Sequence, residues 1–342
     1  MRRGICHCPC MASVSFSDRR IVRALAGAAA YLFEFPLCWA AFGVTAAAAL
    51  IWQSFGVIRM PSTAVMFVPM GLVACTRLLC LCLSDIFACP QRLRAALARL
   101  LIGGEYFFLC MCTTWATIAL VYLLASLNFP LVDAALHRLD LFVGFDWQAG
   151  FRWMKNQRLL GQVYHTLIPQ LVFIMVYFTV FLNTHRLREV FWNLFLALIA
   201  MGILSAFFPA MGPASFLGIT EEFVAVQKSF AHVFADMQAL RAGKNPDFTN
   251  HGPGGIITFP SFHSSCAILY IYALRDARYG INGAALALNG AMLVSIPFFG
   301  NHYLGDVAAG IAMAVAIIFL VRRLQGPEGQ ARTFFTAASQ PA

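Results

Sequence analysis

The sequence has very few charged residues for its length. Only 11% of its 342 residues are Asp, Glu, Lys or Arg, whereas 60% are hydrophobic. Soluble domains carry about 25% charged residues, so an ordinary soluble enzyme and a disordered protein are both excluded. No acidic or Asn/Gln-rich tract is present either, which excludes a low-complexity protein. The chain contains instead a series of long apolar runs, which are typical of an integral membrane protein.

Patterns typical of metal sites and of nucleic-acid binding are also missing. Cys6, Cys8 and Cys10 stand at every second position, whereas zinc sites usually separate paired cysteines by about two to four residues and need a second pair. The net charge of +9 comes from short basic clusters between apolar runs. Such clusters orient membrane spans rather than bind nucleic acid. We therefore expect no metal, no cofactor and no nucleic-acid partner.

Apolar windows long enough to cross a bilayer, about 20 residues each, indicate the membrane spans. They lie at 35–58, 60–84, 106–128, 159–184, 190–209, 261–278, 280–299 and 302–321. The second is the weakest prediction, because Arg77 lies inside it and a central arginine costs roughly 2.5–3.5 kcal/mol. The sequence thus predicts an all-α integral membrane protein with about eight transmembrane helices.

The distribution of basic residues predicts the orientation of these spans. Most of the 24 Lys and Arg residues fall on one side when both chain ends are placed there. The positive-inside rule makes that side the cytoplasm. The spans at 261–278 and 302–321 then begin on the extracytoplasmic or lumenal side.

Two segments on the expected outer side are too long to be simple turns. Residues 129–158 contain Trp147 and Trp153, and because Trp prefers the membrane interface we expect one or two interfacial helices there. Residues 220–243 predict an amphipathic helix. Its apolar residues recur at helical spacing: Phe223, Val226, Phe230, Val233, Phe234, Met237 and Leu240. This helix either packs on the spans or forms a lid or lipid-entry gate, and the sequence leaves both open.

The stretch GPGGIITFPSFHSSCAI at 252–268 predicts a helix that begins beside a histidine. Pro260 ends the preceding loop and Ser261 is a suitable N-cap, which puts His263 in the first turn. Free N–H groups and the positive end of the dipole make a helix N-terminus suitable for binding an anion.

A second polar stretch, FFGNHYLGDVAAG at 298–310, carries a histidine and a carboxylate at spacing i and i+4. His302 and Asp306 therefore share one helix face, and the carboxylate would fix the imidazole tautomer. The predicted topology brings this pair to the same depth as His263. The 15 residues from His263 to Arg278 span about 22 Å, less than the roughly 30 Å of the hydrocarbon core. A recessed site of this kind suits a lipid substrate.

The two motifs, PSFH and GNHYLGD, resemble the second and third motifs of the type 2 phosphatidic acid phosphatase superfamily. The resemblance covers about residues 105–323 and is closest to the inositol phosphorylceramide synthase (aureobasidin-resistance) branch. LFVGFDW and FFPAMGP also look like that branch. It implies a six-span catalytic core over 105–323, preceded by two additional spans over 35–104. A cytoplasmic segment over 1–34 and a flexible cytoplasmic tail over 324–342 complete the expected division.

The resemblance also implies roles for individual residues in a phosphoryl transfer that needs no metal. His302 would be the nucleophile that takes the phosphoryl group, and Asp306 would orient it. His263 would be the general acid for the leaving alcohol and the base for the acceptor. Ser261 and Gly300 would help to hold the phosphate oxygens. The substrate would be a lipid phosphate or a phospholipid.

The sequence departs from the superfamily in its cationic residues. The first motif, K-x₆-R-P, is absent, because Lys155 is followed seven residues later by Gln162. The arginine that the family has six residues before the third-motif histidine is Ile296 here. A phosphoryl group in transfer needs positive charge beside it. The candidates on the expected outer side are Arg241, Lys244, Lys155 and Arg158.

Several functions fit these patterns. The main interpretation is a lipid phosphotransferase that works through phosphohistidine, and the missing first motif favours it over a lipid phosphate phosphatase. An inactive scaffold and a proton-coupled transporter are the alternatives of other classes. A transporter would be expected to show an internal repeat with broken helices in paired positions, and no repeat of this kind is evident in the sequence.

Overall fold

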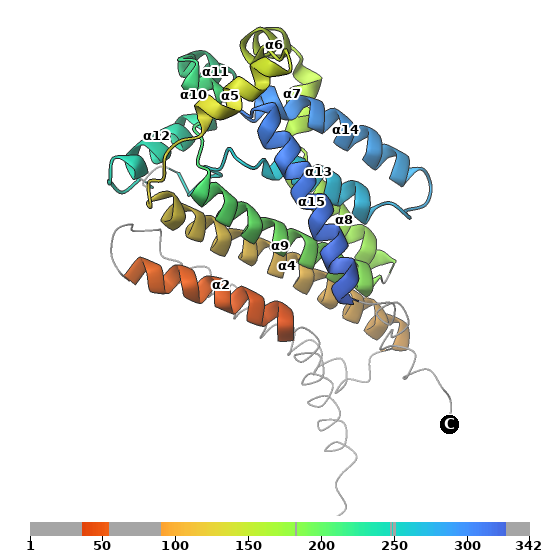
Figure 1. Ribbon diagram of the computed structural model, residues 1–342. Helices are drawn as coiled ribbons and strands as arrows, with labels where there is room; N and C mark the ends of the chain where they lie inside the picture. Colours follow the sequence, from red (N-terminus) through yellow and green to blue (C-terminus); the bar gives the residue numbers. More distant parts are fainter. Residues whose placement is uncertain (1–35, 55–89, 182, 247, 249–250, 326–342) are drawn as a thin grey trace, which may run out of the picture. The chain divides into compact units, whose positions relative to one another are not determined.

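The computed structural model describes residues 36–54, 90–181, 183–246, 248 and 251–325, and all regular structure there is helical (Figure 1). In chain order the helices are α2 (Pro36–Ser54), α4 (Gln91–Ala125), α5 (Asp133–Phe142), α6 (Trp147–Met154), α7 (Arg158–Tyr164), α8 (Leu167–Val180), α9 (Thr184–Phe207), α10 (Pro213–Phe216), α11 (Thr220–Val226), α12 (Phe230–Arg241), α13 (Phe262–Ala273), α14 (Ile281–Phe299) and α15 (Leu304–Gln325). The all-α prediction is confirmed.

The chain divides into two compact units. One contains Met1–Leu37 and Ala64–Leu101, and the structure describes only residues 36–37 and 90–101 of it. The other contains Cys38–Thr63 and Ile102–Ala342. The second unit holds both histidine motifs, and all the packing and site geometry below belongs to it.

Long apolar helices confirm a multi-pass membrane protein. Five segments are long and apolar enough to cross a bilayer: Leu37–Ser54, Arg99–Ala125, Thr184–Phe207, Ile281–Phe299 and Leu304–Leu324. A sixth forms if α7 and α8, which meet at a bend of 55°, make one span. The predicted span at 60–84 lies outside the described residues, so the total of eight stays a prediction.

The segment predicted to span at 261–278 forms the short helix α13, which lies inside the bundle. Its 12 residues cover only about 18 Å, well short of a hydrocarbon core of about 30 Å. α13 packs against α8, α9, α14 and α15, which surround it (Figure 1). Cys266 and Ala267 are fully buried in these contacts. The longer helices around it make up the apolar exterior.

A glycine lets α15 approach α13 closely. A Cβ atom on Gly310 would lie 2.2 Å from Ser264 Oγ and 2.3 Å from the Ser261 carbonyl oxygen. Both distances are far below van der Waals contact, so only glycine fits there. Ser265 Oγ uses the approach to donate to the Gly310 carbonyl oxygen at 2.8 Å. The backbone contact fixes the relative position of the helices that carry the two motifs.

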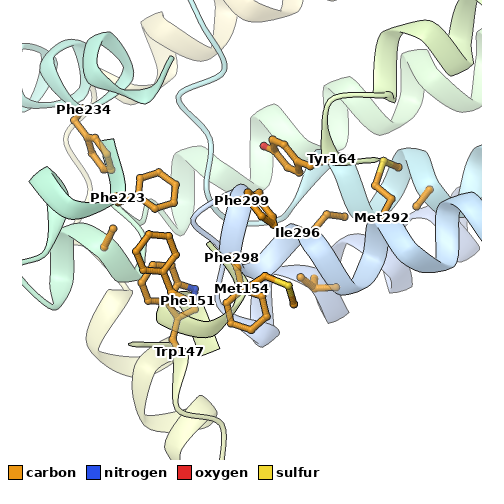
Figure 2. Packing of buried hydrophobic residues seen from close by; sticks show 13 residues of the cluster. Trp147, Phe151, Met154, Tyr164, Phe223, Phe234, Met292, Ile296, Phe298 and Phe299 are labelled. Atoms are coloured by element: carbon orange, nitrogen blue, oxygen red, sulfur yellow. The ribbon is translucent and has the colours of Figure 1, made fainter. Parts of the chain in front are cut away.

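Short helices cover the end of the bundle where α14 ends and α15 begins (Figure 1). One or two helices were expected within 129–158, and two form there, α5 and α6. Trp153 is 65% exposed, as expected of an interfacial residue, but Trp147 is only 1% exposed. Trp147 stacks on Phe151 and donates its indole N–H to the Pro297 carbonyl oxygen at 2.8 Å. Figure 2 shows Trp147 beside Phe151, in an aromatic cluster that joins the short helices to α14.

The amphipathic segment at 220–243 is broken into two helices. α11 ends at Val226 and α12 begins at Phe230, with a turn between them. The predicted apolar face is the buried one, because Phe223 and Phe234 join the aromatic cluster of Figure 2.

Candidate active site

The two predicted motifs meet where α13 begins. Ser261 caps this helix, since its Oγ accepts the backbone N–H of Ser264 at 3.4 Å. The backbone N–H of Ser261 donates to the carbonyl oxygen of Asp306 at 3.1 Å. The first turn of α13 and the first turn of α15 are therefore joined by a direct hydrogen bond.

His302 lies in the short connection between α14 and α15 and is held by Asp306. Its Nδ1 is 3.3 Å from Asp306 Oδ2, and the same oxygen accepts the N–H of Tyr303 at 2.9 Å. A hydrogen bond with the backbone of Thr258 holds the ring as well. His302 is 4% exposed and Asp306 is fully buried. The pair forms although His302 lies just outside the helix whose face it was predicted to share.

His263, in the first turn of α13, is held by stacking. The ring of Tyr164 lies parallel to the imidazole, with centroids 4.3 Å apart and an angle of 13° between the planes. His302 and His165 are close enough to act electrostatically on His263. The imidazole has no hydrogen-bond partner among the residues that the structure describes. The sequence analysis missed Tyr164, because its place beside His263 depends on the bend between α7 and α8.

A second missed group, Asp133 and Asn301, fixes the connection that carries His302. Asp133 accepts the N–H groups of Met211 and Gly212 and the hydroxyl of Tyr303. Asn301 accepts the N–H of Ala214 at 2.8 Å through its side-chain oxygen. The segment FFPAMGP is thereby bound to GNHYLGD. An aspartate and an asparagine beside otherwise apolar residues were the only sequence signals for this role.

Asp140 of α5 completes the support for the start of α15. Its Oδ1 accepts the backbone N–H of Leu304 at 3.1 Å, so it caps the helix from a distant part of the chain. Burial raises the pKa of Asp140 to about 6, since a desolvated carboxylate is less stable.

The four cationic candidates do not contact the histidines. Lys155 forms an ion pair with Glu222 at 2.8 Å, and Arg241 donates to the carbonyl oxygen of Phe129 at 3.2 Å. Arg158 and Lys244 are exposed. Within the described ranges none of the four forms a hydrogen bond or an ion pair with His263, His302 or Asp306. Their proposed role in holding phosphate therefore gains no support from these contacts.

A small cavity lies beside the histidine-bearing connection and under α12. Phe230, Phe234 and Met237 of α12 line one side of it, and Thr258 and Gly300 line the other. Its volume of about 20 Å³ has room for roughly one water molecule.

The backbone at Gly300 passes close to both His302 and Tyr164. A Cβ atom there would lie 2.7 Å from the His302 ring and 3.0 Å from the Tyr164 ring. The position therefore accepts no side chain, as expected of a residue whose backbone lies against the reacting groups.

The two histidines, Asp306 and the N-terminus of α13 can together transfer protons and bind an anion. An imidazole paired with a carboxylate is a suitable base or nucleophile, and a second imidazole can serve as a general acid. The N-terminus of α13 offers backbone N–H groups to a phosphate. In the described part of the chain no group of three or more His, Cys, Asp or Glu is placed to hold a metal ion. Independence from metal stays a prediction.

Comparison with known proteins agrees with the motif resemblance. A family model described as the PAP2 superfamily matches residues 134–320, more than half of the chain. The matched stretch contains both histidines, Asp306 and Tyr164. Comparisons with curated proteins and with solved structures give no match.

Proposed function

The chain belongs to the PAP2 superfamily, and on this basis we propose that it is a membrane-embedded lipid phosphotransferase that works through a phosphohistidine. Membership supports phosphatase-type transfer of lipid phosphoryl groups in general. The nucleophile, the acceptor and the side of the membrane are the proposed parts.

In the proposed reaction, His302 attacks the phosphorus atom of the donor lipid. In this proposal Nδ1 keeps its proton and donates it in a hydrogen bond to Asp306 Oδ2, 3.3 Å away, and Nε2 forms the P–N bond. The bond between phosphorus and the alcohol oxygen breaks, and His263 gives its proton to that oxygen. An acceptor alcohol then attacks the phosphorus, its proton passes to His263, and the P–N bond breaks. The observation that carries this mechanism is the buried, carboxylate-held His302.

The phosphate would be held mainly by the backbone in this proposal. The first turn of α13, after Ser261, offers N–H groups at the positive end of a helix dipole. Gly300 allows the phosphate to approach the chain beside His302. The family's cationic residues are missing from their usual positions. Arg241, Lys244, Lys155 and Arg158 stay candidates for substitutes only if they move on substrate binding.

The covered site favours transfer to an alcohol over hydrolysis. Phe230, Phe234 and Met237 of α12 line the cavity beside Gly300, and in the proposal this helix covers the site and moves when a lipid enters. A covered phosphohistidine is protected from bulk water until an acceptor binds. The motifs also resemble those of the inositol phosphorylceramide synthase branch. This resemblance supports transfer to an alcohol as well, with a sphingolipid or a polyol as the acceptor. The distribution of Lys and Arg supports an extracytoplasmic or lumenal site with both chain ends in the cytoplasm.

A lipid phosphate phosphatase is the second candidate. The observation that favours it is the size of the cavity, which has room for about one water molecule beside the histidines. Both candidate functions imply the same division of the chain. It consists of the segment 1–34, the spans of 35–104, the catalytic core of 105–323 and the tail of 324–342.

One experiment tests the nucleophile. The purified protein is mixed briefly with a lipid phosphate carrying ³²P, and the label on the protein is measured after acid and after alkali. We expect a label that is stable to alkali and lost in acid, as a phosphoramidate should be. It should be absent from His302→Ala and retained in the matched control His185→Ala, whose side chain lies at the start of α9. Turnover without any label in the wild type would contradict the mechanism.

A second experiment separates the two candidates. With a labelled donor and an added alcohol such as inositol or glycerol, transferred product is counted against free phosphate. We expect transfer to dominate with a suitable acceptor. Replacing Phe230 and Phe234 by Ser should shift the ratio toward free phosphate. Free phosphate as the sole product over a broad panel of acceptors would make the protein a phosphatase, and no turnover would favour a scaffold or a transporter.

A further inference from the structure

A cavity of about 480 Å³ lies at the far end of the helices from His302. It forms where α8 and α13 end and where α9 and α14 begin. Its wall includes Tyr177, Phe178, Phe181, Arg186, Asp276 and Arg278. The 19 residues of α14 extend about 28 Å from the cavity to the connection that carries His302, whereas the part of α13 from His263 to Ala273, which lines the cavity, extends only about 15 Å. The spans Thr184–Phe207 and Ile281–Phe299 both begin beside the cavity, so it lies at the ends of these spans opposite the His302 connection.

A buried carboxylate holds the arginine side of this cavity in place. Glu189, 4% exposed, accepts from Arg186 at 2.8 Å, from Arg275 at 3.2 Å and from the hydroxyl of Tyr272 at 2.5 Å. Arg186 also pairs with Asp276, at the wall of the cavity. Long arginine side chains are thus fixed before any ligand arrives, which lowers the entropic cost of binding.

The charged residues that line the cavity favour an anion, because Arg186 and Arg278 outnumber Asp276. Arg278 is exposed and forms no ion pair with any residue in the described part of the chain. A free guanidinium matches the oxygens of a phosphate, which it can bind with two hydrogen bonds.

The remaining wall favours a lipid. Tyr177, Phe178 and Phe181 line the cavity beside the arginines, and Phe181 is 59% exposed at its rim. Aromatic rings of this kind suit the glycerol backbone and the upper acyl chains, while the phosphate meets the arginines. Basic pockets between transmembrane helices are known hosts of anionic head groups.

We propose that this cavity binds the phosphate head group of an anionic phospholipid from the leaflet opposite the histidine site. A lipid held there joins the ends of α8, α9, α13 and α14. It would stabilise the packing of α13, whose other end carries His263. The length of α14, about 28 Å, separates this lipid's phosphate from His302, so we do not expect it to be transferred there. The proposal does not depend on the phosphohistidine mechanism.

The test measures lipid binding by the full chain, with His302→Ala present in every protein so that turnover of lipid does not interfere. Short-chain phosphatidylglycerol is added to protein in neutral detergent, and retained lipid and the unfolding temperature are recorded. Phosphatidylcholine and inorganic phosphate are the comparison ligands. Arg278→Gln removes the free cation. Arg323→Gln is the matched control, because Arg323 is an exposed arginine near the end of α15 that does not line the cavity.

We expect phosphatidylglycerol to bind and to raise the unfolding temperature, and phosphatidylcholine to do neither. Arg278→Gln should weaken the binding roughly tenfold, as loss of a charge-assisted hydrogen bond predicts, while Arg323→Gln leaves it unchanged. An unaltered unfolding temperature without lipid shows that Arg278→Gln is folded. Equal losses in the two variants, or no loss in either, would refute the site. An equal response to inorganic phosphate would refute its assignment to a lipid.

Discussion

Replacing Tyr164 tests whether stacking positions the general acid. The ring lies parallel to His263 at 4.3 Å and is 5% exposed, so the contact is shielded from water. A cation beside an aromatic face gains about 2 kcal/mol when desolvated. If the stack stabilises protonated His263 as the acid, Tyr164→Leu should slow the departure of a poor leaving group roughly 30-fold. Tyr164→Phe keeps the aromatic face and should keep most of the rate.

The assay compares two substrates on the same protein. A lipid phosphate has a poorly leaving alcohol that needs the proton of His263, whereas p-nitrophenyl phosphate releases a phenolate that needs little help. We expect Tyr164→Leu to reduce kcat strongly for the lipid and weakly for p-nitrophenyl phosphate, in the same pattern as His263→Ala. A general loss of folded protein would reduce both equally. Equal losses for the two substrates, or equal losses in the Phe and Leu variants, would refute the positioning role.

The remaining predictions concern the other parts of the site. Asp306→Asn should lower kcat by roughly 10²–10⁴, because the amide N–H₂ would face His302 Nδ1 and force the wrong tautomer; a normal rate would exclude the pair from catalysis. Activity should survive EDTA and be inhibited by vanadate, whereas loss with EDTA and rescue by Mg²⁺ would contradict phosphohistidine chemistry. Gly310→Ala should cost about 1–3 kcal/mol of stability through its clash with Ser264, measured as a lower unfolding temperature, while Gly290→Ala, with open space around it, should cost nothing. The raised pKa of Asp140 means that the folded protein binds this proton more tightly than the unfolded chain, so stability should fall as pH rises from about 4 to about 6. The fall should be smaller in Asp140→Asn, and an identical pH profile would show that Asp140 does not titrate in this range.

The sequence predicted the features that depend on local pattern. Runs of about 20 apolar residues predict helices that cross a membrane, because a helix satisfies its backbone hydrogen bonds within the segment itself. The spacing of His302 and Asp306 brings them together over a single turn of chain, and the pair forms even though the helix starts two residues later. Ser261 caps α13 as predicted, since capping involves only the next three residues.

Features that depend on long-range packing were missing from the prediction. Residues 261–278 were predicted as one span, whereas α13 ends at Ala273 and packs against α8, α9, α14 and α15, so a span at 261–278 stays a prediction. Trp147 is a typical interfacial residue by composition, but its indole N–H donates to the carbonyl oxygen of Pro297, 150 residues away along the chain. Hydropathy cannot distinguish a lipid-facing surface from the interior of a helix bundle.

The sequence by itself determined that this is an all-helical membrane protein with two histidines and an aspartate in two short motifs. Only the tertiary structure decided how those motifs meet. The hydrogen bond from Ser261 to Asp306, the close approach at Gly310 and the Tyr164 ring on His263 join segments that lie far apart along the chain. Such contacts depend on where helices cross. The crossing points are set by the packing of the whole bundle, and no local pattern of residues encodes them.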